Sequence, residues 1–293
     1  MRPAWWPGWQ ATAELVRLPA VLSVPGDVLV GAAAAGWPHR RRTGALIASS
    51  GCLYWAGMAL NDWADRAEDA VDRPGRPIPS GRVRPGFAVG LAGALTAAGF
   101  GLAAAAGGRS AVRVAVPLVA AIWAYDLRAK STVAGPPAMA AARALDVLLG
   151  AGAARASWPA AGTIAAHTAV VTYLSTVETS GGEAAARAAR TAVAGTAAVT
   201  ALAGRAARSP GGAGGLARTA LLGGYAYSLG RAELAASRDP RPATVQRAVG
   251  TGVLGLIPLQ AGLLAGSGTA RLGCGLATLW PLARRLARRV SPT

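Results

Sequence analysis

Long apolar segments, separated by short charged or turn-rich joints, dominate this 293-residue sequence. Hydrophobic residues make up 53% of the chain and charged residues only 15%, which excludes a disordered coil and an ordinary soluble surface. A helix needs about 20 mostly apolar residues to cross a bilayer. Candidate segments run approximately over 15–36, 44–61, 86–107, 111–126, 136–154, 160–177, 188–204, 215–236, 247–266 and 270–287.

These segments predict an all-α fold, a polytopic integral-membrane helical bundle with nine to ten transmembrane helices in a single domain over 1–293. Many of their positions are Gly or Ala, and small residues allow helices to approach closely in lipid. Two helix counts remain open, because the joint at 266–270 is short enough to be a kink. We expect a multi-pass protein of the cell membrane.

The chain carries 30 Lys and Arg residues against 13 acidic residues, a net charge of +17. Nucleic acid is one partner that such a charge fits. The arginines, however, occur in small groups such as 40–42 between apolar stretches, which is typical of residues that flank membrane helices. A GC-rich genome explains the preference for Arg equally well. We therefore expect no nucleic-acid partner. On a ten-helix count, basic-residue bias places the N-terminus and the polar loop at 62–85 on the cytoplasmic side, whereas a nine-helix count leaves the two sides equally basic.

Five of the 13 acidic residues fall between 62 and 72. Asn61, Asp65 and Asp69 advance by four residues, so on a helix they share one face. Oxygen ligands on one face suit Mg²⁺, which also keeps waters and phosphate oxygens in its shell. The spacing predicts a metal site at a helix end; the alternative is a solvated, charge-alternating cap on a membrane helix.

An arginine-rich turn follows the acidic residues directly, and together they form a polar segment over 62–85. Arg76 and Arg82 in this turn are suited to hold the anionic oxygens of a diphosphate. We expect the 62–85 segment to act as a catalytic cap loop that holds a diphosphate together with Mg²⁺.

The pattern Asn61-Asp62-x-x-Asp65-x-x-x-Asp69, leading into Arg76-Pro77-Ile78-Pro79-Ser80-Gly81, resembles the first aspartate-rich motif of the UbiA superfamily of intramembrane prenyltransferases. Shorter matches at 15–19 and 125–130 extend the resemblance, and the bundle covers nearly the whole chain. The resemblance implies a Mg²⁺-dependent transferase that moves an isoprenoid chain from a prenyl diphosphate to a lipophilic, often aromatic, acceptor in the lipid bilayer.

The same resemblance implies roles for individual residues. Asn61, Asp65 and Asp69 become metal ligands, with Asp65, Asp69 and Lys130 as the catalytic set. The diphosphate contacts become Arg76, Tyr125 and Lys130, to which we add Arg82 and Arg143.

The second acidic motif departs from the family pattern of two aspartates four residues apart after the sixth helix. Here the corresponding segment carries Glu178 and Glu183, five apart. We expect both to serve as metal ligands. This form resembles a divergent branch of the superfamily found in bacterial gene clusters, with either a different substrate or a weakened activity.

Arg143 and Asp146 lie three residues apart in one apolar segment, and unpaired charges are costly in lipid. One interpretation is a structural ion pair; the other is that Arg143 faces the diphosphate and Asp146 orients it. Two other functions also stay open for the chain. The first is a transporter or flippase of a lipophilic molecule, which inverted repeats would favour, and the second is a catalytically weak UbiA-like scaffold.

Overall fold

The computed structural model describes residues 7–17, 22–206 and 212–287. Within those ranges it contains helices and turns but no strand, which confirms the all-α prediction. The helices are α1 (Trp9–Leu15), α2 (Val24–Ala34), α3 (Thr43–Ala64), α4 (Arg66–Asp72), α5 (Pro85–Ala124), α6 (Gly135–Ala151), α7 (Trp158–Ser175), α8 (Gly182–Arg205), α9 (Gly212–Arg238), α10 (Pro242–Gly266), α11 (Ala270–Ala277) and α12 (Leu279–Ala287).

Proline and glycine set many of the helix ends. Proline stands at the first or second position of α2, α5, α6, α7 and α10, where its missing N–H needs no helical partner. Gly152 ends α6 with φ 59° and ψ 35°, the left-handed conformation that glycine adopts most readily. Because proline and glycine stand at these helix ends, the apolar segments and the turn residues of the sequence predicted the positions of most helices.

The segments predicted at 86–107 and 111–126 both lie in α5, which is interrupted between them. Gly108 there has φ 59° and ψ −147°, so the helical path is broken and the chain changes direction. The Arg42 guanidinium donates to the carbonyl oxygens of Ala105, at 3.1 Å, and Ala106, at 3.4 Å. Carbonyls at a helix end lack intrahelical donors, so Arg42 caps this break from a neighbouring turn.

Two segments predicted as single helices are divided instead. Of the 15–36 segment, Leu15 ends α1 and Val24–Ala34 forms α2; Arg17 after α1 has φ 46°, which ends a right-handed helix. The 270–287 segment separates into α11 and α12, because Pro281 has no N–H to bond the carbonyl of Ala277. Leu18, Pro19 and the arginines at 288–289 lie outside the described residues.

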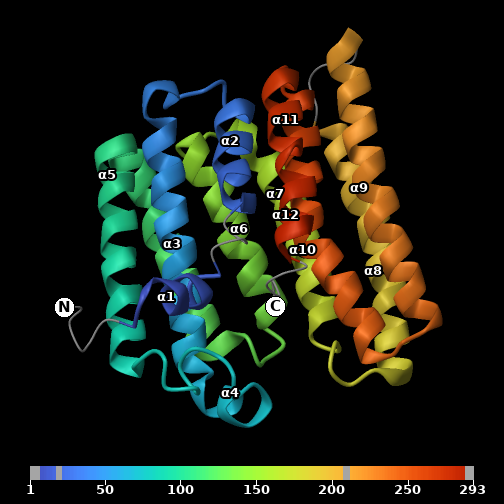
Figure 1. Ribbon diagram of the computed structural model, residues 1–293. Helices are drawn as coiled ribbons and strands as arrows, with labels where there is room; N and C mark the ends of the chain where they lie inside the picture. The colour runs from blue at the N-terminus through green and yellow to red at the C-terminus, as the bar shows by residue number, and fades with distance from the viewer. Residues whose placement is uncertain (1–6, 18–21, 207–211, 288–293) are drawn as a thin grey trace.

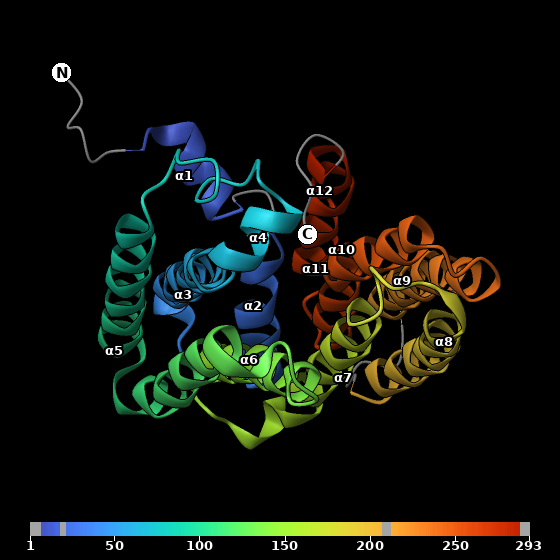
Figure 2. The same cartoon turned by 90° about the horizontal axis from the view of Figure 1, so that it is seen from below.

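The helices pack side by side in a bundle (Figures 1 and 2). One apolar cluster joins α2, α3, α5 and α6, and a second joins α7 to α12. Val28 of α2 contributes to the first cluster, whereas Val147 of α6 contributes to the second. Helices α2 and α6 therefore connect the two parts of the bundle.

Glycine lets the backbones of α2 and α6 touch. A Cβ at Gly31 would overlap the carbonyl oxygen of Val147, and a Cβ at Gly150 would overlap that of Val28. Small residues that allow such close approach are typical of helix packing in membranes. The contact between α2 and α6 is therefore made by backbone as well as by side chains.

The 62–85 segment folds into an ordered cap at one end of the bundle. Helix α4 crosses the end of α3 there (Figures 1 and 2). Ile78 and Val83 of the following turn are buried against Leu60 and Ala88. Burial of these apolar side chains fixes the cap to α3 and α5.

Among the described residues, three helical stretches are long and apolar enough to cross a bilayer by length and composition. They are Arg40–Ala64, Pro85–Ala129 and Pro242–Gly266, with mean hydropathies of 1.2, 1.8 and 1.7 in their most apolar windows. The count of nine to ten transmembrane helices remains a prediction, because the other helices are shorter or less apolar.

Candidate functional site

The acidic motif lies where α3 passes into α4. Asp65 ends α3 and begins α4 with φ −84° and ψ 0°. Its N–H donates to the carbonyl of Asn61 at 2.9 Å, and its own carbonyl accepts from the N–H of Asp69 at 2.8 Å. The helical hydrogen-bond pattern thus continues across the junction. This continuity supports the predicted common face of Asn61, Asp65 and Asp69.

Three basic side chains pair with the acidic residues of this motif. Arg76 Nη1 lies 2.9 Å from Asp69 Oδ2 and 3.3 Å from Asp62 Oδ1, and Arg17 Nη2 lies 3.4 Å from Asp62 Oδ1. Lys130 Nζ forms an ion pair with Asp65. Carboxylates stacked on one helix face repel one another, and these cations compensate that repulsion.

A π-helical turn at Tyr125–Ala129 brings the end of α5 to the same place. The N–H of Lys130 donates to the carbonyl of Tyr125 at 3.0 Å, an i to i+5 bond. Asn61 Nδ2 donates to the buried carboxylate of Asp126 at 3.3 Å. The π turn therefore directs both Asp126 and Lys130 to the acidic motif, and π turns occur often at functional sites.

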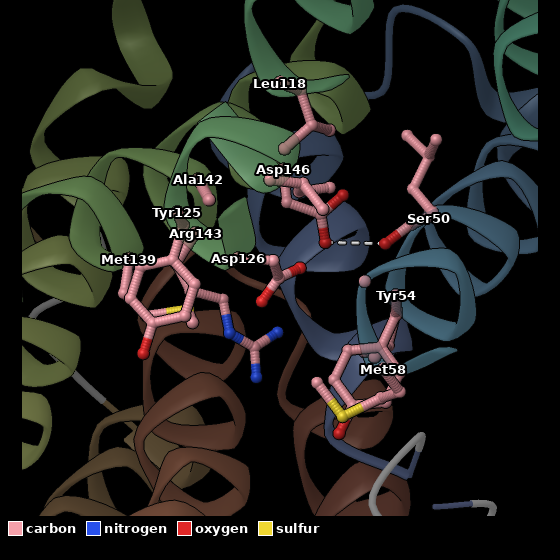
Figure 3. Close-up of a pocket in the computed structure, with 14 residues that line it drawn as sticks. Ser50, Tyr54, Met58, Leu118, Tyr125, Asp126, Met139, Ala142, Arg143 and Asp146 are labelled. Atoms are coloured by element: carbon pink, nitrogen blue, oxygen red, sulfur yellow. Dashed lines mark hydrogen bonds between the residues drawn. The ribbon is translucent and has the colours of Figure 1, made fainter. Parts of the chain in front are cut away.

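An apolar cavity extends from this polar end into the bundle, between α3, α5 and α6. It has about 600 Å³ of space, including the open solvent at its mouth. Leu53, Leu118 and Ile122 contribute to its walls, and Tyr125 and Asp126 lie at the polar end. Figure 3 shows the side chains of Asp126 and Arg143 directed into this space. Such a cavity suits a molecule with an apolar body and a charged head.

Arg143 and Asp146 both line the cavity, but they do not pair with each other. Arg143 pairs across the bundle with Asp27 of α2 at 2.5 Å, and donates to Ser23 Oγ at 3.1 Å. Asp146 Oδ2 accepts from Ser50 Oγ at 2.6 Å (Figure 3), and its Oδ1 has no hydrogen-bond partner. Of the two interpretations of these residues, the structural Arg143–Asp146 ion pair is therefore wrong, since the partner of Arg143 is Asp27 of another helix.

Two of the predicted site residues lie away from the acidic motif. Arg82 extends to α1, where its Nη1 donates to Glu14 Oε2 at 2.6 Å. Glu183 is 71% exposed and pairs with Arg190 on its own helix at 3.0 Å. The structure does not bring Glu183 to the other predicted metal ligands.

Glu178, the other residue of the second acidic segment, is partly buried near the charge of Arg73. Its Oε2 is buried without a hydrogen-bond partner. Burial raises the pKa of Glu178, and the positive charge of Arg73 opposes that rise. Arg73 directly follows α4, so the electrostatic effect of its charge on Glu178 links the second acidic segment to the cap.

The oxygen atoms of the site are of the kind that binds a hard cation. Their oxygens belong to Asn61, Asp62, Asp65 and Asp69, the ligands that Mg²⁺ prefers. In the described part of the chain, however, no three Asp, Glu, His or Cys side chains are placed to hold a metal ion. The acidic side chains pair with arginine and lysine instead.

Sequence reasoning did not assign roles to Arg17, Asp62 or Asp126. Arg17 and Asp62 both stood within the motifs, but their pairing joins residues 45 positions apart. Asp126 was detectable as an acid at the end of an apolar segment, beside Tyr125.

The fold and site together define a helical bundle in which an ion-paired polar cap adjoins an apolar cavity through the Asn61–Asp126 contact. Residues 22–180 match the model of the UbiA prenyltransferase family. The match covers more than half of the chain, which therefore belongs to this family. Membership in this family, together with the three apolar helices, identifies it as a membrane protein.

Curated relatives match parts of the sequence. The chain is 34% identical over 102 residues to chloroplastic chlorophyll synthase of Oryza sativa subsp. japonica, covering 33% of this chain and 27% of the relative. It is 34% identical over 130 residues to digeranylgeranylglyceryl phosphate synthase of Methanopyrus kandleri, covering 42% and 45%. The chain thus spans less than half the length of either relative.

Solved structures share the fold over a larger part of the chain. A UbiA homologue from Archaeoglobus fulgidus, bound to GPP and Mg²⁺, superposes with a TM-score of 0.61 at 15% identity, covering 86% of this chain and 99% of that one. A digeranylgeranylglyceryl phosphate synthase structure superposes with a TM-score of 0.61 at 13% identity, covering 88% and 98%. At these identities the likeness establishes the fold alone.

The Arg143–Asp27 pair provides a test of the site's framework. Replacing one partner, as Arg143→Met or Asp27→Leu, should cost about 3–5 kcal/mol of stability, because the other charge is left buried and unpaired. The double variant should cost much less than the sum of the two. Thermal unfolding in detergent measures all three, with Glu183→Ala and Arg190→Ala as an exposed control pair worth under about 1 kcal/mol. Additive losses at Asp27 and Arg143 would contradict the pairing.

Proposed function

We propose that this protein is a Mg²⁺-dependent membrane prenyltransferase. It transfers an isoprenoid chain from a prenyl diphosphate to a lipophilic acceptor. The observation that carries the proposal is that the ion-paired acidic motif, with Asp65 on Lys130 and Asp69 on Arg76, is joined through Asn61 to Asp126, which lines an apolar cavity. A prenyl diphosphate has an anionic head and an apolar tail, so it needs a charged site and an apolar cavity side by side.

The basic residues of the cap have a direct role in this reaction. Loss of diphosphate from an allylic carbon places negative charge on the leaving group. Arg76 and Lys130 would donate hydrogen bonds that stabilise that charge as it develops. Tyr125, at the same end of the cavity, supplies a hydroxyl for a further diphosphate contact.

The acidic residues would hold the metal. Asn61, Asp65 and Asp69 supply oxygen ligands, with Glu178 as the candidate from the second acidic segment. Mg²⁺, when bound, supplies charge that stabilises the leaving diphosphate. Glu183 is not part of the proposed set, because it is exposed and paired with Arg190.

The apolar cavity would protect the reaction from water. An allylic cation is captured by water unless its site is dry, and Leu53, Leu118 and Ile122 provide such walls. Asp146, with one carboxylate oxygen unpaired, is the candidate to accept a hydrogen bond from the acceptor. The altered second motif also keeps a catalytically weak scaffold as the second candidate.

Metal and prenyl diphosphate should bind cooperatively. Arg76 and Lys130 now pair with the carboxylates, so a diphosphate that attracts these cations leaves Asp65 and Asp69 free for Mg²⁺. Geranyl diphosphate and Mg²⁺ together should raise the melting temperature by more than the sum of their separate effects. Thermal unfolding in detergent measures this, and Asp69→Asn should reduce the excess. Purely additive shifts in the unsubstituted protein would contradict the exchange of partners.

Catalysis itself is tested with labelled prenyl diphosphates of several chain lengths, Mg²⁺ and a membrane extract as the source of acceptor. Asp65→Asn and Asp69→Asn should each lower product formation by at least about 100-fold, the scale of losing one transition-state contact. Glu183→Gln, the matched acid outside the site, should leave it nearly unchanged. A labelled product that both Asp variants form at the normal rate would refute the proposed site, and a protein that binds these ligands without any product would support the scaffold.

The proposed orientation has the cap on the cytoplasmic side. On a ten-helix count, basic residues are more numerous at that end, in agreement with the positive-inside tendency. Ser80→Cys in the cap and Arg109→Cys beyond the α5 break provide probes at the two ends. Cys52 and Cys274 are first replaced by Ala, because both are free thiols. In right-side-out cells an impermeant maleimide should then label the Arg109→Cys variant and spare the Ser80→Cys variant; the reverse pattern would invert the orientation.

A further inference from the structure

A second hollow, which is lined by polar side chains, lies at the opposite end of the bundle from the cap. It is formed by residues 37–42, which connect α2 to α3, and by 106–108 at the break in α5. Its space, including the open solvent above it, is about 770 Å³. In Figure 1 the α2–α3 connection is at the top of the bundle and α4 is at the bottom. The hollow is therefore separate from the proposed active site.

The charge around this hollow is entirely positive. Arg40, Arg41 and Arg42 form a 3₁₀ turn along its edge, and no Asp or Glu lines it. Arg42 is engaged with the carbonyls of the α5 break. Arg40 and Arg41 are exposed, and their side chains make no hydrogen bond or ion pair to any described residue. Two guanidinium groups thus remain free to bind an external anion.

His39 supplies a further polar group at a fixed position in the hollow. Its Nε2 is buried and has no hydrogen-bond partner among the described residues. The ring packs on glycine, since a Cβ at Gly152 would collide with Nε2. The His39 carbonyl accepts from Thr43 Oγ1 at 3.0 Å, which holds the turn. A buried polar atom without a partner is costly, so a ligand donor or acceptor here would be stabilising.

The position of the hollow matches the level of lipid headgroups. The apolar stretch that includes α3 begins at Arg40, so the arginines stand at the boundary between its apolar part and water. Half-buried Trp37 lies beside them, and Trp is enriched at membrane interfaces. The positive-inside tendency places basic residues at the cap end of the bundle. Three consecutive arginines at the other end therefore need an explanation besides membrane orientation.

We propose that this hollow binds a phosphate group, supplied by the headgroup of an anionic phospholipid. Arg40 and Arg41 would grip the phosphate oxygens with their planar N–H donors, while His39 and Arg42 shape the inner wall. Free inorganic phosphate shares this chemistry, but a lipid headgroup also brings its acyl chains to the apolar surface of the bundle below.

The test titrates the full chain in detergent with dioleoylphosphatidylglycerol, dioleoylphosphatidylcholine or inorganic phosphate, and follows thermal unfolding and bound lipid by native mass spectrometry. Phosphatidylglycerol should stabilise the protein most. In Arg40→Gln/Arg41→Gln its apparent affinity should fall by about tenfold or more. Arg109→Gln/Arg113→Gln removes the same charge from exposed arginines outside the hollow, and should retain most of the affinity.

Each result has a defined meaning. Stabilisation by phosphatidylglycerol that depends on Arg40 and Arg41 supports the lipid site. Equal stabilisation in both double variants, or in phosphatidylcholine, would overturn it. A dependence on these arginines for inorganic phosphate but not for phosphatidylglycerol would also overturn the lipid assignment. Arg40→Lys/Arg41→Lys keeps the charge but not the planar donors, and should bind with intermediate affinity.

Discussion

The buried ion pair between Arg143 and Asp27 is the interaction on which the arrangement of the site depends. It joins α6 to α2 at a distance of 116 residues in the sequence, and Gln260 of α10 adds a hydrogen bond to Asp27 at 2.8 Å. Helices from both parts of the bundle therefore meet at one carboxylate. Because a lone charge is costly in an apolar environment, the packing must keep Asp27 and Arg143 together, and Arg143 is held at the wall of the cavity as a result.

The sequence located most helices because two simple properties control them. Apolar length identified α3, α5 and α6 to α10, and proline or glycine marked their ends. The i, i+4 spacing of Asn61, Asp65 and Asp69 likewise predicted a shared face, because the hydrogen bonds of a helix are local. These features need no knowledge of distant residues.

The features that were not predicted depend on contacts between distant segments. Asp126 joins the site only because a π turn rotates the end of α5, and its partner Asn61 is 65 residues away. Arg143 has a neighbouring acid in Asp146, yet pairs with Asp27 instead. Glu183 carries the expected charge, but the helix that contains it offers Arg190 on an exposed face. Charge and spacing along one segment do not determine which of several partners is nearest in space.

The backbone contact between α2 and α6 limits where molecules can enter or leave the cavity. Gly31 and Gly150 leave no room for even a methyl group between the two helices, so no acyl chain can slide between them where they touch. Both helices also border the cavity, through Val24 and Ala142. The wall that they share is closed to the surrounding lipid at these contacts, and molecules that enter or leave the cavity from the bilayer must pass elsewhere.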